Sequence, residues 1–375
     1  MLKEKDLIAL APYLSDGTVV HMEVQDFGNK GREVMLEYGD GRKVSGNLDA
    51  NPVRLKPVGI SSISEHFARG KYGNPNWRGN CSGLLIKELL EHFRPDTFGD
   101  LAVGSGTAID VAADLGYGSD RTVFNDLNPA YGGVDISDPD IDFPLLDFIF
   151  FHPPYYVFPG SSMPVYSGKG ADGRGMWGKE INPHDGSRIK DPWAFKKWFD
   201  QCNANLYRLL HKGGRLAILM GDSRFRGKYY SMFKEMDVFG EMEQVIVKKQ
   251  YNCVSNSTSY PGKFIPLVHE YLVVIRKGSP YIVPVTTVRH VQCDLRTSKN
   301  STWASVMAMI LEDHGGRLSR RQLSEEMQRT EKANANNHVD AKMRQEIQRH
   351  PRMFRCDGED VLLARPAKEE ASMAA

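Results

Sequence analysis

The sequence predicts an α/β fold, because three segments pair strands with helices across turns rich in glycine or proline. Residues 98–107 read as a short strand, a Gly-x-Gly turn and the start of a helix. Residues 147–151 read as a buried apolar strand, and Pro153-Pro154 ends it because proline has no backbone N–H to donate to a ladder. Residues 193–222 run from an amphipathic helix through Lys-Gly-Gly into another apolar strand.

Length and composition set the broad class. The chain has 375 residues and 41% hydrophobic residues, enough for one large domain and one or two small ones. It contains no run of about eighteen apolar residues and no apolar signal core at its start, so we expect a cytoplasmic protein without a membrane partner. The five cysteines are scattered, which predicts neither a disulfide framework nor a metal site.

Charge is distributed unevenly along the chain. Residues 97–150 carry ten aspartates and one arginine, whereas residues 151–265 carry seventeen lysines or arginines against ten acids. The first segment suits a cationic ligand rich in hydroxyl groups, and the second suits a polyanion. Ordinary solvated surface is an equally good reading of this bias.

The glycine turn and a later acid indicate a site for a nucleoside-like ligand. Gly104 and Gly106 lack side chains, so a ligand can approach the backbone and the following helix start. Asp126 ends a short strand about twenty residues later, where its carboxylate can accept both hydroxyls of a ribose.

The corner after residues 147–151 is suited to a planar amine. It presents His152, the carbonyl of Pro153 and the ring of Tyr155 at the carboxyl end of a strand, where open α/β sheets bind ligands. These groups offer hydrogen-bond acceptors in the plane of the ligand and an aromatic face against it.

Three stretches together resemble one enzyme family. Residues 147–156 resemble motif IV, (Asp/Asn/Ser)-Pro-Pro-(Tyr/Phe/Trp), of the S-adenosylmethionine-dependent methyltransferases that modify exocyclic amines, mostly of DNA bases. Residues 100–107 resemble motif I, although Leu101-Ala102-Val103 replaces the usual Pro-Phe-x, and residues 76–93 resemble motif X. The resemblance covers residues 76–277, and its motif order is like the γ arrangement.

The resemblance implies a class I, Rossmann-like methyltransferase fold. Its mixed seven-stranded sheet would end in a closing antiparallel hairpin, and residues 70–278 would be the catalytic domain, with recognition loops at 157–192 and 252–263. Residues 1–58 read as a small β unit of the Tudor or SH3 kind. Residues 301–366 read as three helices and a hairpin, which resembles a winged helix.

The same resemblance implies that S-adenosylmethionine is the cofactor. Asp135, with Asp138 second, is our choice for an adenine contact, although a turn-forming aspartate is an equal reading. Ser82 is also expected to cap the helix that follows it. The residues expected to bind the cofactor are Asn80, Cys81, Ser82, Asp100, Gly104, Gly106, Thr107, Asp126 and Asp135.

The expected catalytic residues are His152, Pro153, Pro154 and Tyr155. His152 and the Pro153 carbonyl would accept the two N–H groups of the amine and concentrate its lone pair toward the methyl group, while Tyr155 stacks on the flipped base. His152 departs from the family pattern, because a histidine nitrogen accepts only when the ring is neutral. With an unperturbed histidine pKa, activity would fall below about pH 6.

Double-stranded DNA is the expected partner, with the N6 amine of adenine as target. The residues expected to contact DNA are Lys169, Arg174, Arg188, Arg224, Arg226, Lys228 and Tyr229. The alternatives are an N4-cytosine DNA methyltransferase, an RNA or protein-glutamine methyltransferase, and a catalytically silent DNA-binding or antirestriction module. A protein partner or dimer contact through an appendage is a further expectation.

Overall fold

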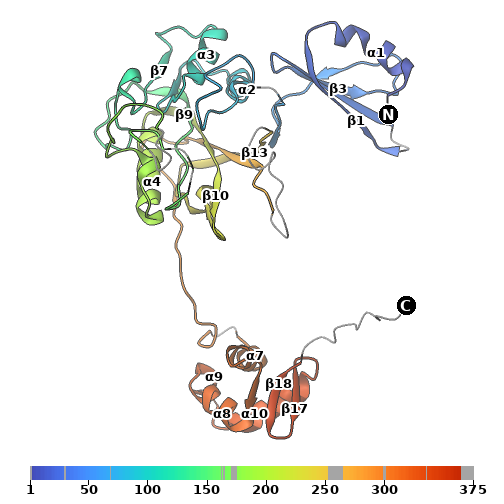
Figure 1. Ribbon diagram of the computed structural model, residues 1–375, viewed down its shortest axis with the longest axis vertical. Helices are drawn as coiled ribbons and strands as arrows, with labels where there is room; N and C mark the ends of the chain where they lie inside the picture. Colours follow the sequence, from blue (N-terminus) through green and yellow to red (C-terminus); the bar gives the residue numbers. More distant parts are fainter. Residues whose placement is uncertain are drawn as a thin grey trace. The chain divides into compact units, whose positions relative to one another are not determined.

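The computed structural model (Figure 1) contains two compact units, Met1–Val288 and Arg289–Ala375. The structure describes residues 2–28, 31–67, 69–161, 163, 165–169, 175–251, 265–298, 301–334 and 336–364. None of the helices in these ranges is both long enough and apolar enough to cross a membrane.

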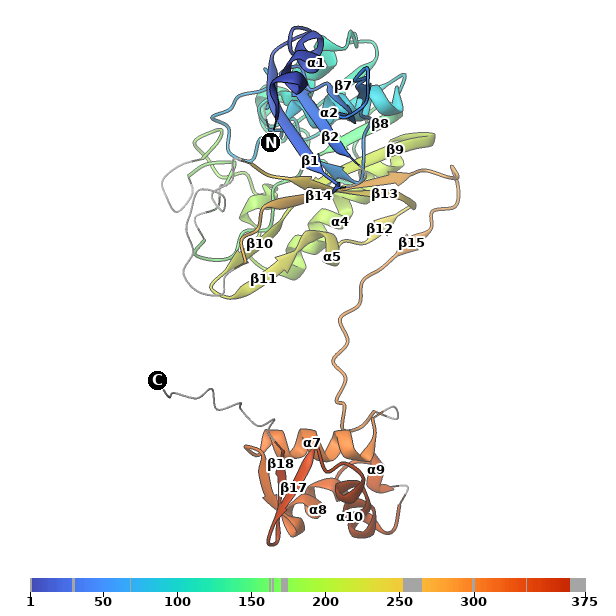
Figure 2. The same ribbon diagram turned by 90° about the vertical axis from the view of Figure 1, so that its right-hand side faces the viewer.

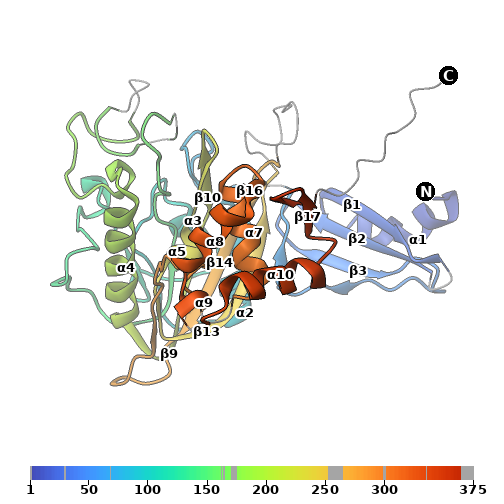
Figure 3. The same ribbon diagram turned by 90° about the horizontal axis from the view of Figure 1, so that it is seen from below.

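The first unit begins with a small antiparallel sheet and one helix (Figure 3). The elements are α1 (Glu4–Leu14), β1 (Val19–Asp26), β2 (Arg32–Tyr38), β3 (Lys43–Asn47) and β4 (Lys56–Pro57), with sheet order β1-β2-β3-β4. Leu10 of α1 packs with Val34, Leu36 and Tyr38 in a small core. The sequence predicts the β unit but not α1, whose helical pattern is short and contains Pro12.

A mixed seven-stranded sheet forms the centre of the first unit, in the order β5-β13-β14-β9-β8-β6-β7. Its strands are β5 (Ile63–Ser64), β6 (Phe98–Asp100), β7 (Thr122–Phe124), β8 (Leu146–Phe151), β9 (Leu210–Met220), β13 (Glu241–Lys249) and β14 (His269–Arg276). Strands β7, β6, β8 and β9 run parallel, and β14 is antiparallel to both β9 and β13. This is the Rossmann-like mixed sheet that the sequence predicts.

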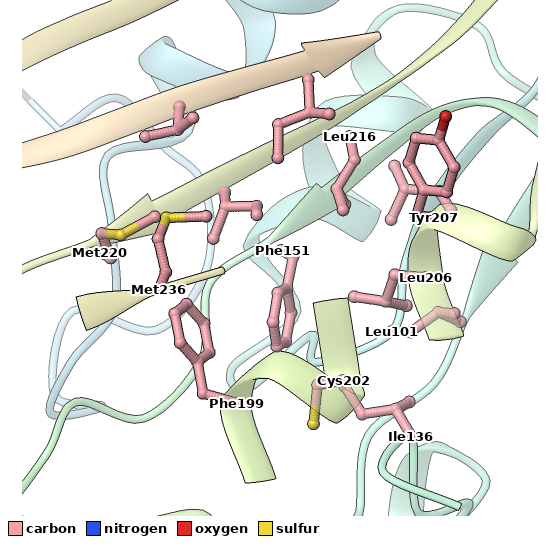
Figure 4. Close-up of a cluster of buried hydrophobic side chains, with 14 of the residues drawn as sticks. Leu101, Ile136, Phe151, Phe199, Cys202, Leu206, Tyr207, Leu216, Met220 and Met236 are labelled. Carbon is pink, nitrogen blue, oxygen red and sulfur yellow. The ribbon is translucent and has the colours of Figure 1, made fainter. Parts of the chain in front are cut away.

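Helices cover both faces of this sheet, as Figure 2 shows for α2 (Gly83–Phe93) and α4 (Pro192–Arg208). Helix α3 (Thr107–Asp114) packs on the same face as α2. Phe148 and Phe150 of β8 face α2, whereas Ile149 and Phe151 face α4. Figure 4 shows Phe151 on the side of Phe199 and Cys202 of α4. Side chains alternate across a strand, so a strand buried on both faces is apolar throughout. Each fully buried phenylalanine here stabilises the fold by about 2–3 kcal/mol.

The remaining elements of the first unit are short. They are η2 (Pro129–Tyr131), η3 (Gly186–Arg188), β10 (Asp222–Phe225), β11 (Lys228–Ser231), α5 (Met232–Glu235), β12 (Val238–Phe239) and β15 (Val285–Thr286). Strands β10 and β11 form an antiparallel hairpin, so the basic and aromatic stretch after β9 is a hairpin arm.

The second unit has its own core of Val306, Met307, Leu311, Leu323 and Met327. Its elements are α7 (Trp303–Asp313), β16 (Arg317–Ser319), α8 (Arg320–Gln328), α9 (Glu331–Asn334), α10 (Val339–Arg349), β17 (Phe354–Asp357) and β18 (Asp360–Leu363). Its sheet has the order β16-β18-β17. The three longer helices and the final hairpin lie where the sequence places them, and a winged-helix function for this unit stays a prediction.

Candidate active site

Two pockets meet at the carboxyl end of β8. We name the first the glycine-loop pocket; it encloses about 850 Å³, including space open to solvent, and its lining includes Gly104, Asp126 and His152. We name the second the hairpin pocket; it encloses about 1530 Å³ on the same basis and is lined in part by Lys248 and Glu270 of the β13–β14 pair. His152, Asn80, Gly79 and Tyr166 line both pockets.

The glycine loop is held to the end of β7 by a carboxylate. Asp126 accepts the backbone N–H of Gly104 at 2.9 Å through Oδ2 and that of Asn128 at 2.8 Å through Oδ1. Gly104 has φ 54°, and a Cβ atom there would lie 3.3 Å from the Trp77 indole nitrogen. Gly106 has φ 86° and precedes α3, but it does not line the pocket. Gly106 therefore shapes the turn, and its expected contact with the cofactor stays a prediction.

Four aspartates line the glycine-loop pocket, and the sequence predicts three of them, Asp100, Asp126 and Asp135, to bind the cofactor. Asp100 is 3% exposed, and burial raises the pKa of its carboxyl to about 7, with a further increase from Asp126 and a partial offset from the Ala102 N–H. Burial also raises the pKa of Asp126 above its ordinary value. Asp135 lines the pocket as well and pairs with His184 Nδ1 at 2.7 Å. The three carboxyl groups lie where the sequence predicts a cofactor site.

The motif X segment divides between the two pockets. Asn80 accepts a hydrogen bond from the Thr107 hydroxyl, which ties this segment to the start of α3. Cys81 is buried, and burial raises the pKa of its thiol to about 12, so it is not a nucleophile. Ser82 occupies the N-cap position of α2 without making a side-chain capping bond; its hydroxyl faces the Arg69 carbonyl at 3.4 Å. The expected capping bond is therefore wrong, whereas the expected contact of Ser82 with the cofactor stays a prediction, and Ser82 lines the hairpin pocket.

The glycine-loop pocket is acidic and aromatic. Its aromatic lining residues include Trp77, Tyr166, Trp177 and Trp198, and no lysine or arginine is among its described lining residues. Aromatic faces and carboxylates both attract cations. Tyr166 and Trp177 come from the 157–192 loop, which the sequence assigns to DNA recognition, so part of that loop is a wall of this pocket.

The hairpin pocket has the opposite charge. Its basic lining residues are Arg69, Arg78, Lys248 and Lys249, and its aromatic ones are Phe67, Tyr155, Tyr166 and Tyr251. The Phe67 ring lies against the Tyr251 ring with centroids 4.2 Å apart. A basic chamber with aromatic walls suits an anionic ligand that carries flat rings.

A chain of hydrogen bonds runs from His152 into the sheet. His152 Nε2 lies 3.1 Å from the Tyr155 hydroxyl, and that hydroxyl donates to Glu270 Oε1 at 2.6 Å. Lys248 Nζ donates to Glu270 Oε2 at 2.5 Å. Burial would raise the pKa of Glu270, but the Lys248 ammonium outweighs it and holds that pKa below its usual value.

The pKa of His152 corrects an expectation from the sequence. Burial lowers it to about 4, with the nearby Glu270 carboxylate opposing the shift and Lys248 adding to it. The imidazole is therefore neutral through the mildly acidic range, and the loss of activity that the sequence leads us to expect below about pH 6 moves toward pH 4.

The residues expected to contact DNA that the structure describes are not among those that line the hairpin pocket. Arg188 donates from Nε to the Ser167 carbonyl at 2.9 Å and from Nη2 to the Lys169 carbonyl at 2.9 Å. With its side chain 19% exposed, Arg188 holds its own loop together, and its contact with DNA stays a prediction. Lys169 itself is exposed. Arg174 and the 252–263 loop lie outside the described residues.

The β10–β11 arm carries the other expected DNA contacts. Arg226, Lys228 and Tyr229 are exposed near its turn. Arg224 donates to the Ile265 carbonyl at 2.8 Å and lies 5.3 Å from the centroid of the Tyr229 ring. The arm is thus a surface feature beside the site, and its contact with DNA stays a prediction.

The residues behind His152 were missed by sequence reasoning. Lys248 and Glu270 face each other directly in the β13–β14 register. The available signal was a charge inside each of two apolar segments predicted to form a hairpin, because opposite charges stabilise a cross-strand pair. Arg69 and Phe67 had no such signal, since they lie in an irregular segment.

Comparison with known proteins gives weak likenesses only. No family model and no curated protein matches the chain. Among solved structures, TrmN from Thermus thermophilus aligns over 52% of this chain and 49% of its own at 16% identity and a TM-score of 0.30. TehB from Haemophilus influenzae aligns over 51% of this chain and 61% of its own, at 13% identity and a TM-score of 0.29. A candidate DNA modification methylase, also from Thermus thermophilus, aligns over 35% of this chain and 56% of its own, at 21% identity and a TM-score of 0.21. The chain therefore matches less than two thirds of each of these structures, and its fold rests on its own sheet order.

Proposed function

We propose that this chain transfers a methyl group from S-adenosylmethionine to an exocyclic amine of a nucleic-acid base, with the N6 amine of adenine in double-stranded DNA favoured. The observation that carries the proposal is the position of His152, which lines an acidic pocket on one side and a basic pocket on the other. A group transfer between two ligands of opposite charge needs such a junction.

The glycine-loop pocket fits the proposed cofactor. S-adenosylmethionine, when bound, supplies a methyl group on a positively charged sulfur. Asp126 is placed to accept ribose hydroxyls with the lone pairs that its two backbone bonds leave free. The aromatic walls and carboxylates favour a cation, and Gly104 leaves the backbone open to close approach.

The hairpin pocket would receive the base. His152 and Pro153 both line it, and a neutral imidazole nitrogen and a carbonyl are the two acceptors that an amine with two N–H groups needs. Accepting these hydrogens concentrates the nitrogen lone pair toward the methyl group, and His152 then takes the proton that the amine loses. Tyr155 supplies an aromatic face for the base.

The charge of the hairpin pocket favours a nucleic acid over a protein glutamine. Four cationic side chains line it against the single carboxylate of Glu270. Phosphate groups account for such a surplus, and a flipped base fits between aromatic side chains. DNA is favoured over RNA by the sequence resemblance, and N4-cytosine remains the second base. A silent binding module would share the pockets but form no product.

The test is nucleoside mass spectrometry of DNA and RNA from a host that lacks its own methyltransferases and expresses the chain. We expect N6-methyladenine in DNA from cells with the natural chain and none with His152→Ala. His92→Ala is a matched control, because His92 is an exposed histidine on α2 outside both pockets. Methylated bases confined to RNA would redirect the proposal, and none in either nucleic acid would favour the silent module.

A further inference from the structure

We propose that Glu270 and the Tyr155 hydroxyl are positioning groups that lock His152 in one tautomer, with its proton on Nε2 and a bare Nδ1 facing the acceptor substrate. The inference rests on the proposed function for its purpose, but not for its physical basis. It gives the β13–β14 pair a role in the reaction and explains how a histidine can stand where the family carries an oxygen acceptor.

The hydrogen count fixes the tautomer. The Tyr155 hydroxyl has one hydrogen, and it points to Glu270 Oε1 at 2.6 Å, because an ionised carboxylate can only accept. The Tyr155 oxygen can then only accept from His152 Nε2, which lies 3.1 Å away. Nε2 must therefore carry the single hydrogen of the neutral ring, and Nδ1 keeps its lone pair.

The ion pair between Lys248 and Glu270 keeps the Glu270 carboxylate ionised. Glu270 is 5% exposed and Lys248 is 9% exposed, so a lone carboxyl here would favour its neutral form. Lys248 Nζ lies 2.5 Å from Glu270 Oε2, directly across the β13–β14 pair. A protonated Glu270 could donate to the Tyr155 hydroxyl, which would then donate to His152 and reverse the direction of both hydrogen bonds. The Lys248 ammonium prevents this by keeping Glu270 ionised.

The locked tautomer matters because the opposite one would repel the substrate. In the described residues, His152 Nδ1 has no hydrogen-bond partner, and His152 lines both pockets. A hydrogen on Nδ1 would meet an amine N–H, donor against donor, and the lone pair of the amine would lose its orientation. Fixing the proton on Nε2 makes the site selective for groups that donate an N–H.

The test reads the tautomer directly by nuclear magnetic resonance of the full chain carrying ¹⁵N-labelled histidine at pH 7. The His152 signals are identified by their loss in His152→Ala. We expect a protonated Nε2 and an unprotonated Nδ1 in the natural chain, and a mixture of tautomers in Tyr155→Phe. Tyr117→Phe is the matched control, because it removes a hydroxyl that donates to the Pro95 carbonyl, outside the chain of bonds.

Two double variants separate the effect of the hydrogen-bond acceptor at position 270 from the effect of the Lys248–Glu270 charges. Lys248→Met with Glu270→Gln keeps a carbonyl acceptor for Tyr155, whereas Lys248→Met with Glu270→Leu does not, and neither leaves a buried unpaired charge. We expect the first double variant to keep the Nε2–H tautomer and the second to lose it. A hydrogen on Nδ1 in the natural chain, or a single unchanged tautomer in Tyr155→Phe, would overturn the proposal.

Measurement of the methylation rate tests the positioning role independently of the tautomer. Tyr155→Phe should lower kcat by about 10- to 100-fold, the size of effect seen when a metal-binding histidine loses the hydrogen bond that orients it, and leave cofactor affinity unchanged. If no substrate is ever methylated, the proposed function fails while the tautomer measurement still decides this inference. If methylation occurs but Tyr155→Phe matches the natural chain in kcat, the positioning role fails.

Discussion

At the scale of single residues, the environment of His152 determines how the reaction should depend on pH. Burial lowers the pKa of His152 to about 4, so the acceptor form persists well below the ordinary histidine range. As pH falls through that value the ring gains a proton and loses its acceptor. We expect the single-turnover rate of methyl transfer to show no His152-dependent change from about pH 5.5 to 8 and to fall toward pH 4.

His152→Asn provides the control for this profile. An asparagine is one of the acceptors that the family uses, so the variant should retain activity and lack the acidic decline. A natural-chain profile with a midpoint near the ordinary histidine value would show that the ring is solvated during catalysis and would contradict the buried geometry.

Asp100 gives a second prediction at this scale. Its pKa of about 7 means that a substantial fraction of the carboxyl is protonated at neutral pH. A cation bound in the glycine-loop pocket favours the ionised form, so binding should release a proton and affinity should rise with pH through about 7. Below that value the dissociation constant for S-adenosylmethionine should change by up to about tenfold per pH unit.

Titration calorimetry at pH 6 and pH 8 measures this effect. Asp100→Asn, which has no titrating group, should bind with little pH dependence, and S-adenosylhomocysteine, which lacks the charged sulfur, should show less dependence than S-adenosylmethionine. Equal affinities for the natural chain at both pH values would place the cation away from Asp100.

How far the sequence predicted these residues depends on the range of their contacts. Gly104, Asp126 and His152 lie within four residues of a strand end, so a strand pattern is enough to bring them to one edge of the sheet. Lys248 and Glu270 reach Tyr155 only after β14 has paired with β13 and β9. The bonds of Arg188 within its own loop could not be predicted, because a basic side chain in a loop looks the same in sequence whether it faces solvent or its own loop.

At the scale of elements, the end of β9 supports the catalytic corner through one glycine. Gly221 follows β9, and a Cβ atom there would lie 2.4 Å from Cε2 of the Tyr155 ring. Gly221→Ala must therefore displace the ring or the backbone, because no real Cβ contact is that short. Even a displacement of about 1 Å at a reacting group can cost about 100-fold in rate, so we expect a large loss of kcat with cofactor binding preserved.

The matched control for this substitution is Gly59→Ala. A Cβ atom at Gly59 meets no atom within 4 Å, and its φ is not in the left-handed region. The kinetics of both variants should be read beside their thermal unfolding. Full activity in Gly221→Ala would mean that Tyr155 tolerates displacement and that its hydrogen bonds do not position His152.

The structure of the 157–192 loop could not be predicted from the sequence. Its lack of periodicity indicated a functional loop, and its basic residues suggested DNA. In the structure, Asp185 accepts from the backbone and hydroxyl of both Ser167 and Ser187, which folds this segment against the glycine-loop pocket. A buried carboxylate that organises a loop has no periodic signal, because its partners are fixed by tertiary contacts.

At the scale of the whole molecule, the three segments read from the sequence form two compact units. The small N-terminal sheet and the seven-stranded sheet belong to one unit. His66 illustrates why: its Nε2 lies 3.1 Å from Glu88 of α2, and its Nδ1 lies 3.5 Å from Glu37 of β2. Such a contact joins residues far apart in the chain, and composition alone gives no sign of it.

The segment that follows Val288 is expected to be the first part of the chain that a protease cuts. The described residues 289–298 contain no helix or strand and are almost all exposed, while the second unit has a core of its own. An exposed segment between two separate cores is the preferred site of proteolysis, because cleavage there requires no unfolding. Limited trypsin digestion of the full chain should therefore cut first after Arg289 or Arg296, both exposed, and leave two stable fragments.

Mass spectrometry of the fragments identifies the cut, and calorimetry on each purified fragment locates the cofactor site. We expect all binding of S-adenosylmethionine to stay with the larger fragment, because every lining residue of the glycine-loop pocket precedes Val288. DNA binding by the larger fragment alone, compared with the uncut chain, then measures what the second unit adds. An early cut inside residues 83–249 would instead show that the seven-stranded sheet opens more readily than the connection to the second unit is cleaved.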